Sequence, residues 1–175
     1  VLGTATLDGG GQWSEITVEQ WIYLTENQRD TRTIAKIPSY EIGFSGTNRI
    51  FAGIWIDTGA WNVSGYNRVT YGSSLQKNRW YHVAFTYNNG TLTLYVDGIE
   101  RASKSVTGNI QTSGTEPLYI GWFDYFKGLI DEVRIYPKNL SPQQIYQRYI
   151  ETKDGLTNNS TIVSQETAKG DVWKC

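Results

Sequence analysis

The sequence predicts an all-β protein, a sandwich of two antiparallel sheets with one short helix near its C-terminal end. Short segments alternate between apolar and polar residues, and Gly, Asn, Ser and Asp separate these segments at regular intervals. The clearest case is the hairpin 80–98, in which 88–90 (Asn-Asn-Gly) supplies residues that tolerate the positive φ angles of a tight turn. A hairpin this long and apolar needs a second sheet over its apolar face. The side chains expected to form the floor between the two sheets are Tyr81, Phe85, Leu92, Leu94 and Val96.

The other strands follow in order along the chain. They are expected at 1–8, 16–24, 33–37, 40–44, 49–55, 69–71, 118–121 and 128–136. In the strand 16–24, one face carries Ile16, Val18, Gln20, Ile22 and Leu24. The opposite face, with Trp21 and Tyr23, is not wholly polar, so we expect the outer side of this strand to be partly covered.

One helix is predicted after the last strand. Ser141 is suited to the N-cap, Pro142 to the first helical position, and Gln144 stands where a capping box places its second partner. Ile145 and Tyr149 then form a short apolar stripe.

Length and composition indicate one domain, 1–151, followed by a polar linker, 152–160, and a β-like tail, 161–175. The net charge of -1 argues against nucleic acid or an anionic membrane surface as a partner. No apolar run approaches the roughly 20 residues of a membrane span. The chain begins at Val1 and contains no methionine, which indicates a processed product or an excised fragment. Cys175 is the only cysteine, so a disulfide partner could only lie in sequence beyond this chain.

Three stretches together resemble one family. They are the hairpin 80–98, the segments 118–121 (Leu-Tyr-Ile-Gly) and 126–136 (Phe-Lys-Gly-Leu-Ile-Asp-Glu-Val-Arg-Ile-Tyr), and 139–145 (Asn-Leu-Ser-Pro-Gln-Gln-Ile). Their order and spacing resemble the laminin G-like, or concanavalin A-like lectin-glucanase, jelly-roll module, which is related to the pentraxins. The resemblance implies two curved antiparallel sheets and a helix after the last strand. It also implies a non-catalytic module of a secreted or cell-surface protein that binds glycans or proteins or acts as a spacer, often with a structural calcium ion.

The tail from Asn159 to Cys175 is similar to the first strand of an immunoglobulin-like repeat of secreted microbial surface proteins. In that resemblance, Cys175 is a disulfide cysteine of the strand. A strand-like tail after a linker could also add to the sheet of a neighbouring chain, which would give self-association.

Asp131 is the carboxylate that most suggests a metal site. It alternates with Val133 and Ile135, which are expected to face the core, so its charge must be neutralised or hydrogen-bonded. One interpretation is a calcium ion held by Asp131, Asp8 and backbone carbonyls. The alternative is a carboxylate that caps backbone N–H groups or pairs with an arginine. A pentraxin-type double calcium site is not expected, because the loop 121–128 offers a single carboxylate.

The same loop is rich in aromatic side chains, which cannot all be buried in one short turn. Exposed rings can stack on the C–H faces of sugars, and a carboxylate beside them can accept hydrogen bonds from sugar hydroxyl groups. The candidate ligand-binding residues are Trp122, Phe123, Asp124, Tyr125, Trp61 and Tyr66, with Trp55 and Tyr71 as further candidates. Of these, the residues Trp55, Trp61, Tyr66 and Tyr71 are expected on loops. The alternative is that these rings cover sheet edges or pack against a neighbouring domain.

The sequence does not predict an enzyme. His82, the only histidine, lies within a strand and has no evident nucleophile and acid around it, so we expect a packed, hydrogen-bonded imidazole. Glycoside hydrolases of this fold resemble one another in a Glu-x-Asp-x-x-Glu strand. The segment 130–133 lacks both flanking glutamates, and Glu15, Glu19 and Asp57 are scattered.

We therefore expect a non-catalytic binding module, extracellular or at the cell surface, that contacts glycan or a cell-surface protein through aromatic loops. The alternative is a structural building block of a surface assembly, in which the aromatic side chains and the tail make subunit contacts. Sequons give weak support for secretion, because chance alone yields several in such a chain. The candidate glycosylation sites are Asn62, Asn89, Asn139, Asn158 and Asn159.

Overall fold

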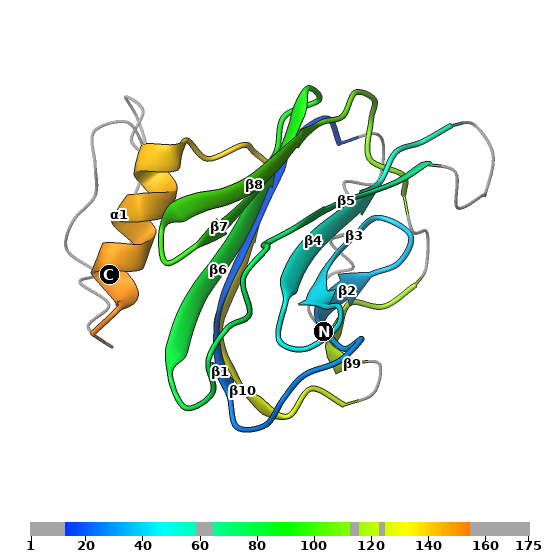
Figure 1. Ribbon diagram of the computed structural model, residues 1–175. Coiled ribbons are helices and arrows are strands. Elements are labelled where there is room, and N and C mark those ends of the chain that lie inside the picture. Colours follow the sequence, from blue (N-terminus) through cyan, green and yellow to red (C-terminus); the bar gives the residue numbers. More distant parts are fainter. Residues whose placement is uncertain (1–12, 59–64, 113–115, 123–124, 155–175) are drawn as a thin grey trace, which may run out of the picture.

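The computed structural model describes residues 13–58, 65–112, 116–122 and 125–154, which form a sandwich of two five-stranded antiparallel sheets (Figure 1). The first sheet has the strand order β10-β1-β6-β7-β8, and the second has the order β5-β4-β3-β2-β9. The strands are β1 (Ile16–Leu24), β2 (Arg32–Lys36), β3 (Tyr40–Phe44), β4 (Ile50–Trp55), β5 (Tyr66–Thr70), β6 (Trp80–Tyr87), β7 (Thr91–Val96), β8 (Ile99–Ser105), β9 (Tyr119–Trp122) and β10 (Gly128–Tyr136).

The core lies between the two sheets. Each strand of the sandwich turns alternate side chains inward, so the apolar face of one sheet meets that of the other. All five residues predicted for the floor belong to this cluster, which confirms the prediction. Its members include Ile16, Val18, Ile22, Leu24, Ile34, Tyr40, Ile42, Phe44, Ile50, Ile54, Tyr81, Val83, Phe85, Leu92, Leu94 and Val96.

The predicted strands agree with the structure best where the alternation is clearest. Strands β1, β3 and β10 have the predicted bounds, whereas β5 begins three residues before the predicted 69–71. Strand β8 was not predicted, because it is an edge strand whose residues are mostly polar and exposed. It follows a tight turn in which Asp97 and Gly98 adopt φ angles of 53° and 73°. The predicted strand 1–8 lies outside the described residues.

Helix α1 (Pro142–Thr152) begins as the sequence predicts. The Ser141 Oγ accepts a hydrogen bond from the Gln144 backbone N–H, and the Gln144 side chain accepts one from the Ser141 backbone N–H at 2.8 Å. This reciprocal pair is the capping box, which satisfies two N–H groups that the helix itself leaves unpaired.

We expect the variant Ser141→Ala to lower the free energy of unfolding by about 1 kcal/mol, because the first turn loses its hydrogen-bond acceptor. Urea denaturation followed by tryptophan fluorescence measures this change. The control is Gln143→Ala, an exposed helical position outside the capping box. An equal loss in both variants would contradict a specific contribution from the cap.

The helix lies on the outer face of the first sheet, where Figure 1 shows it beside β6, β7 and β8. Its buried Ile145 packs with Ala84 and Tyr95 in a second apolar cluster, separate from the core between the sheets. The Trp21 indole donates a hydrogen bond to the Thr152 hydroxyl at 2.8 Å. The prediction that the outer side of β1 is partly covered is therefore confirmed. Among the described residues, no helix has the length and apolar character needed to cross a membrane.

The prediction that Asp131 faces the core is wrong. The pairing register between β1 and β10 shifts by one residue beside it, and Glu132 adopts a φ angle of 51° at this β-bulge. One extra residue reverses the alternation of side chains. As a result, Ile130 and Val133 both pack against the core, while Asp131 is exposed. Its carboxylate accepts a hydrogen bond from the Glu132 backbone N–H at 2.8 Å, in line with the capping alternative.

Candidate functional site

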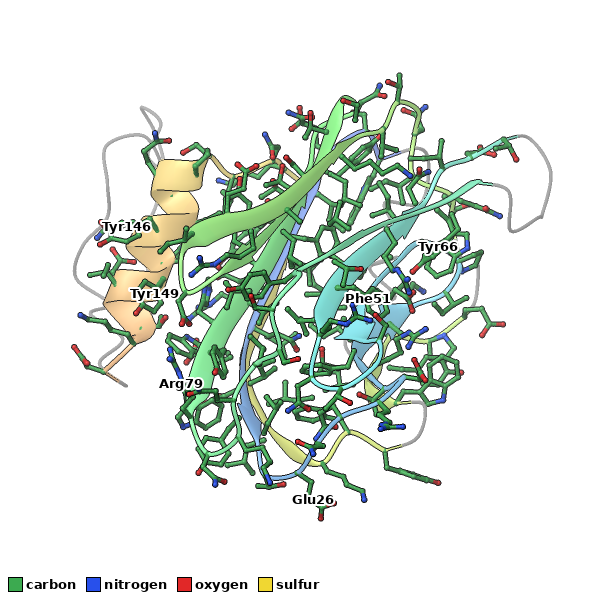
Figure 2. The ribbon with its side chains drawn as sticks, viewed as in Figure 1. Glu26, Phe51, Tyr66, Arg79, Tyr146 and Tyr149 are labelled. Atoms are coloured by element: carbon green, nitrogen blue, oxygen red, sulfur yellow. The ribbon has the colours of Figure 1, made fainter. Side chains whose placement is uncertain are left out.

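An open hollow of about 250 Å3 lies on the outer face of the second sheet. Every strand of this sheet contributes to it, as does the turn after β2, because their outward-pointing residues converge there. Its lining residues are Arg32, Ile37, Glu41, Trp55, Tyr66, Arg68 and Trp122. Figure 2 shows Tyr66 and Phe51 on this sheet, on the side of the molecule away from Tyr146 and Tyr149 of the helix.

Glu41 is the buried polar centre of the hollow, with a side chain that is only 3% exposed. One carboxylate oxygen forms an ion pair with the Arg32 guanidinium. The other accepts a hydrogen bond from the Tyr66 hydroxyl at 2.6 Å. A carboxylate removed from water needs such partners to remain charged. Glu41 therefore holds Arg32 and Tyr66 in place.

Tyr66 is kept as a phenol by these surroundings. Burial raises its pKa, and the negative charge of Glu41 and the hydrogen bond to it raise the pKa further, well above the usual value of 10.0. Its ring lies across Gly53, where a Cβ atom would come within 2.6 Å of the Tyr66 hydroxyl oxygen. The glycine thus allows Tyr66 to lie over β4 and reach Glu41.

Two arginines cover Phe51 on the same face. The guanidinium carbons of Arg32 and Arg68 lie 4.9 Å and 5.0 Å from the centre of the Phe51 ring. Such cation–π contacts fix the position of a guanidinium group while leaving its N–H donors available. Phe51 itself is fully buried.

Pairs of aromatic side chains lie near both edges of the second sheet. At the β4–β5 end, the ring centres of Trp55 and Tyr66 are 4.5 Å apart. At the β9 end, Tyr119 and Trp122 stack with ring centres 4.3 Å apart and planes 17° from parallel. Trp122 remains 39% exposed. The hollow therefore combines flat apolar rings with charged hydrogen-bonding groups, a combination that suits a ligand with both C–H faces and hydroxyl groups.

The structure brings together two of the six predicted ligand-binding residues, Trp122 and Tyr66, in this hollow. Tyr125 is 84% exposed and does not line it. The other three, Trp61, Phe123 and Asp124, lie outside the described residues.

The prediction that Trp55 and Tyr66 stand on loops is wrong, because they belong to paired strands β4 and β5. The parts of the hollow that were not predicted from the sequence are Arg32, Glu41 and Arg68. A signal was available in the alternation, since Glu41 lies between two core residues of β3 and must point to the opposite face.

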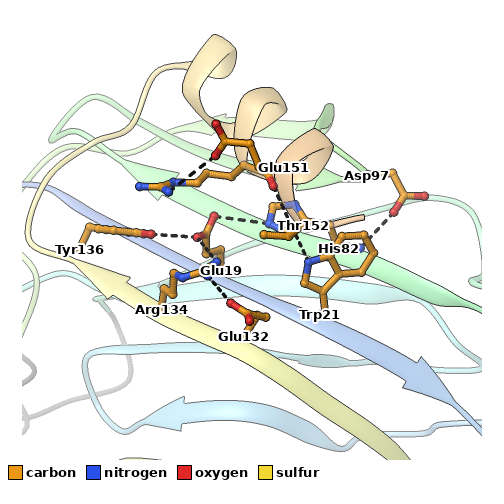
Figure 3. A network of polar contacts seen from close by, with 10 residues as sticks. Glu19, Trp21, His82, Asp97, Glu132, Arg134, Tyr136, Glu151 and Thr152 are labelled. Carbon is orange, nitrogen blue, oxygen red and sulfur yellow. Dashed lines mark hydrogen bonds and ion pairs between the residues drawn. The ribbon is translucent and has the colours of Figure 1, made fainter. Parts of the chain in front are cut away.

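A second polar cluster, centred on Glu19, is buried under helix α1 (Figure 3). The Glu19 carboxylate accepts a hydrogen bond from the Tyr136 hydroxyl at 2.9 Å and lies 3.4 Å from both the His82 Nε2 and an Arg134 nitrogen. Burial opposes ionisation of Glu19, but these partners outweigh it and lower its pKa below 4.5. His82 is 1% exposed and packs against the Trp21 ring, which confirms the predicted packing. The predicted hydrogen bonding is not confirmed, because the buried His82 Nδ1 has no hydrogen-bond partner within the described part of the chain. The burial of this cluster is consistent with a structural role.

The remaining predicted sites stay predictions. Asp8, the second proposed calcium ligand, lies outside the described residues, and within the described ranges no group of three or more acidic, His or Cys side chains could hold a metal ion. Of the sequons, Asn89 is exposed in the β6–β7 turn and Asn139 is half-buried before the helix. The other sequons and the tail 161–175, with Cys175, lie outside the described residues.

Comparison with known proteins gives one family and several similar structures. The model of the concanavalin A-like lectin/glucanases superfamily matches residues 3–146. Domain 4 of AbnA, an extracellular arabinanase from Geobacillus stearothermophilus solved in complex with arabinotriose, is 25% identical with a TM-score of 0.62; the match covers 80% of this chain and 68% of that one. A putative carbohydrate-binding protein from Bacteroides ovatus is 22% identical with a TM-score of 0.64, and the match covers 79% of this chain and 41% of that one. The binding domain of botulinum neurotoxin serotype D is 20% identical with a TM-score of 0.60, over 80% of this chain and 38% of that one.

Proposed function

Because this chain belongs to the concanavalin A-like lectin/glucanases superfamily, we propose that it is a non-catalytic glycan-binding module of an extracellular protein. The observation that carries the proposal is the hollow on the outer face of the second sheet, in which aromatic rings and charged side chains converge. Its volume of about 250 Å3 is below the roughly 300–1,000 Å3 of pockets that enclose drug-sized ligands. We therefore expect it to take a single sugar unit, with neighbouring units running over the open surface.

The arabinanase domain supports both carbohydrate as the ligand and an extracellular setting, since it was solved with arabinotriose and belongs to an extracellular enzyme. Because the two sequences are only 25% identical, the arabinanase domain does not indicate which sugar this chain binds. Calcium, glycosylation and an adhesive role remain separate predictions, which the proposed function does not require.

A binding role suits the chemistry of the hollow better than hydrolysis. Glycoside hydrolases use two carboxyl groups, about 5–5.5 Å or 6.5–9.5 Å apart, of which one donates a proton. Among the described residues, Glu41 is the only carboxylate that lines the hollow. Both of its oxygens already have partners, Arg32 and Tyr66, so it is poorly placed to attack a substrate or to transfer a proton.

The variant Trp122→Ala tests this proposal. We expect it to weaken binding of the best glycan from an array about tenfold or more, because an exposed ring that stacks on a sugar is lost. Trp122→Phe should retain part of the affinity, since a smaller ring still stacks. Isothermal titration calorimetry gives the dissociation constants.

The control is Tyr125→Ala, which removes a more exposed aromatic side chain outside the hollow. Equal weakening in Trp122→Ala and Tyr125→Ala would show that the hollow is not the site. The absence of any bound glycan on an array that includes neutral and acidic sugars would contradict the proposed function itself.

A further inference from the structure

The charged groups of the hollow are not equivalent. Its lining contains two arginines and one glutamate. Glu41 is buried and uses both carboxylate oxygens, one of them in the ion pair with Arg32. The negative charge of Glu41 is therefore matched by Arg32 within the wall of the hollow.

Arg68 is the charge that remains for a ligand. It is exposed, and it forms no ion pair within the described part of the chain. Its guanidinium is held over the Phe51 ring at 5.0 Å, so its planar fork is positioned before any ligand arrives. A positioned guanidinium is the group that best recognises planar or tetrahedral oxyanions through paired N–H donors.

This positive charge is a local feature. The chain as a whole has a net charge of -1, so it has no general attraction for anions. The guanidinium also lies within one hollow with the exposed ring of Trp122, where a sugar can stack. A glycan bound in the hollow could therefore present a C–H face to the indole and an oxyanion to the guanidinium.

We propose that the hollow selects acidic glycans, and that Arg68 pairs with a carboxylate or sulfate group carried by the sugar. This inference rests on the proposed glycan-binding function and names the chemical class of the glycan. Arg68 acts as the specificity-determining residue, while the aromatic rings supply affinity for any sugar. Carboxylated and sulfated sugars share the feature that Arg68 would recognise, which is an oxyanion substituent on a pyranose or furanose ring.

The test compares two acidic ligands with a neutral one. The probes are a linear oligouronide, the same oligosaccharide with its carboxyl groups reduced to alcohols, and a sulfated oligosaccharide of matching length. We expect one of the two acidic probes to bind about tenfold or more tightly than the reduced probe, because a hydrogen-bonded ion pair is lost on reduction. The acidic probe that binds more tightly shows whether the recognised oxyanion is a carboxylate or a sulfate.

The variant Arg68→Gln should remove this preference, so that the acidic and reduced probes bind the variant with equal affinity. The matched control is Arg101→Gln, which alters net charge equally. Arg101 is also an exposed arginine over an aromatic ring, 5.3 Å from the centre of Tyr71, but it does not line the hollow. Thermal melting of both variants checks that the sandwich remains folded.

The possible results distinguish the preference for acidic glycans from the general glycan-binding function. Equal binding of the acidic and reduced probes, with loss of both in Trp122→Ala, would overturn the acidic preference and leave the glycan-binding function standing. An acidic preference that survives in Arg68→Gln, or that disappears equally in Arg101→Gln, would overturn the role of Arg68. Failure of every neutral and acidic glycan to bind would overturn both proposals.

Discussion

Replacing Phe85 by alanine is expected to lower the free energy of unfolding by about 3–5 kcal/mol. Phe85 has no exposed surface and lies in strand β6, which is the middle strand of the first sheet. Its neighbours across the strands are Val18 and Leu94, and its ring faces Tyr40 of the opposite sheet at 6.3 Å between ring centres. Because residues of both sheets surround this position, the variant leaves a cavity that neither sheet can close by itself.

Chemical denaturation of Phe85→Ala and of the wild type measures this loss. The control is Tyr125→Ala, an exposed aromatic position outside the core, for which we expect a change within about 0.5 kcal/mol. A loss below about 1 kcal/mol in Phe85→Ala would contradict the packing described here, because a buried phenyl ring contributes more than that.

The second large effect is expected at Glu19. The variant Glu19→Gln keeps the shape of the side chain but removes the charge that His82, Tyr136 and Arg134 face. Breaking a buried pair costs about 3–5 kcal/mol. Arg134 is partly exposed and retains its ion pair with Glu132, so we expect a loss near the lower end of that range. The control is Glu132→Gln, which removes only the outer, half-buried carboxylate, for a loss of about 0–1 kcal/mol.

The pKa of Glu19 sets the pH dependence of this effect. Its partners lower the pKa of the folded state below the usual value of 4.5. The ionised carboxylate therefore contributes stability that is fully present above about pH 4.5 and is lost as the pH falls through the folded-state pKa. The wild type should lose more stability than Glu19→Gln when the pH is lowered from neutral to below 4.5. Parallel pH profiles of the two proteins would contradict this assignment.

Local sequence patterns predicted much of the fold. The alternation in 16–24 and 80–98 gives the inward faces of β1, β6 and β7, because side chains of a strand point alternately to its two sides. Ser141 and Gln144 predicted the start of helix α1, since the capping box is formed by residues three positions apart. The polar edge strand β8 was not predicted, because it has no apolar alternation of its own and is defined by its pairing with β7.

The sequence by itself therefore determined the sandwich, most of its strands, helix α1 and the family to which the chain belongs. The tertiary structure decided the rest, because each remaining feature depends on residues from several strands. The bulge beside Glu132, set by pairing between β1 and β10, turned Asp131 from the core to solvent. The hollow formed by Glu41, Arg68 and Trp122 exists only where strands far apart in the sequence become neighbours in one sheet.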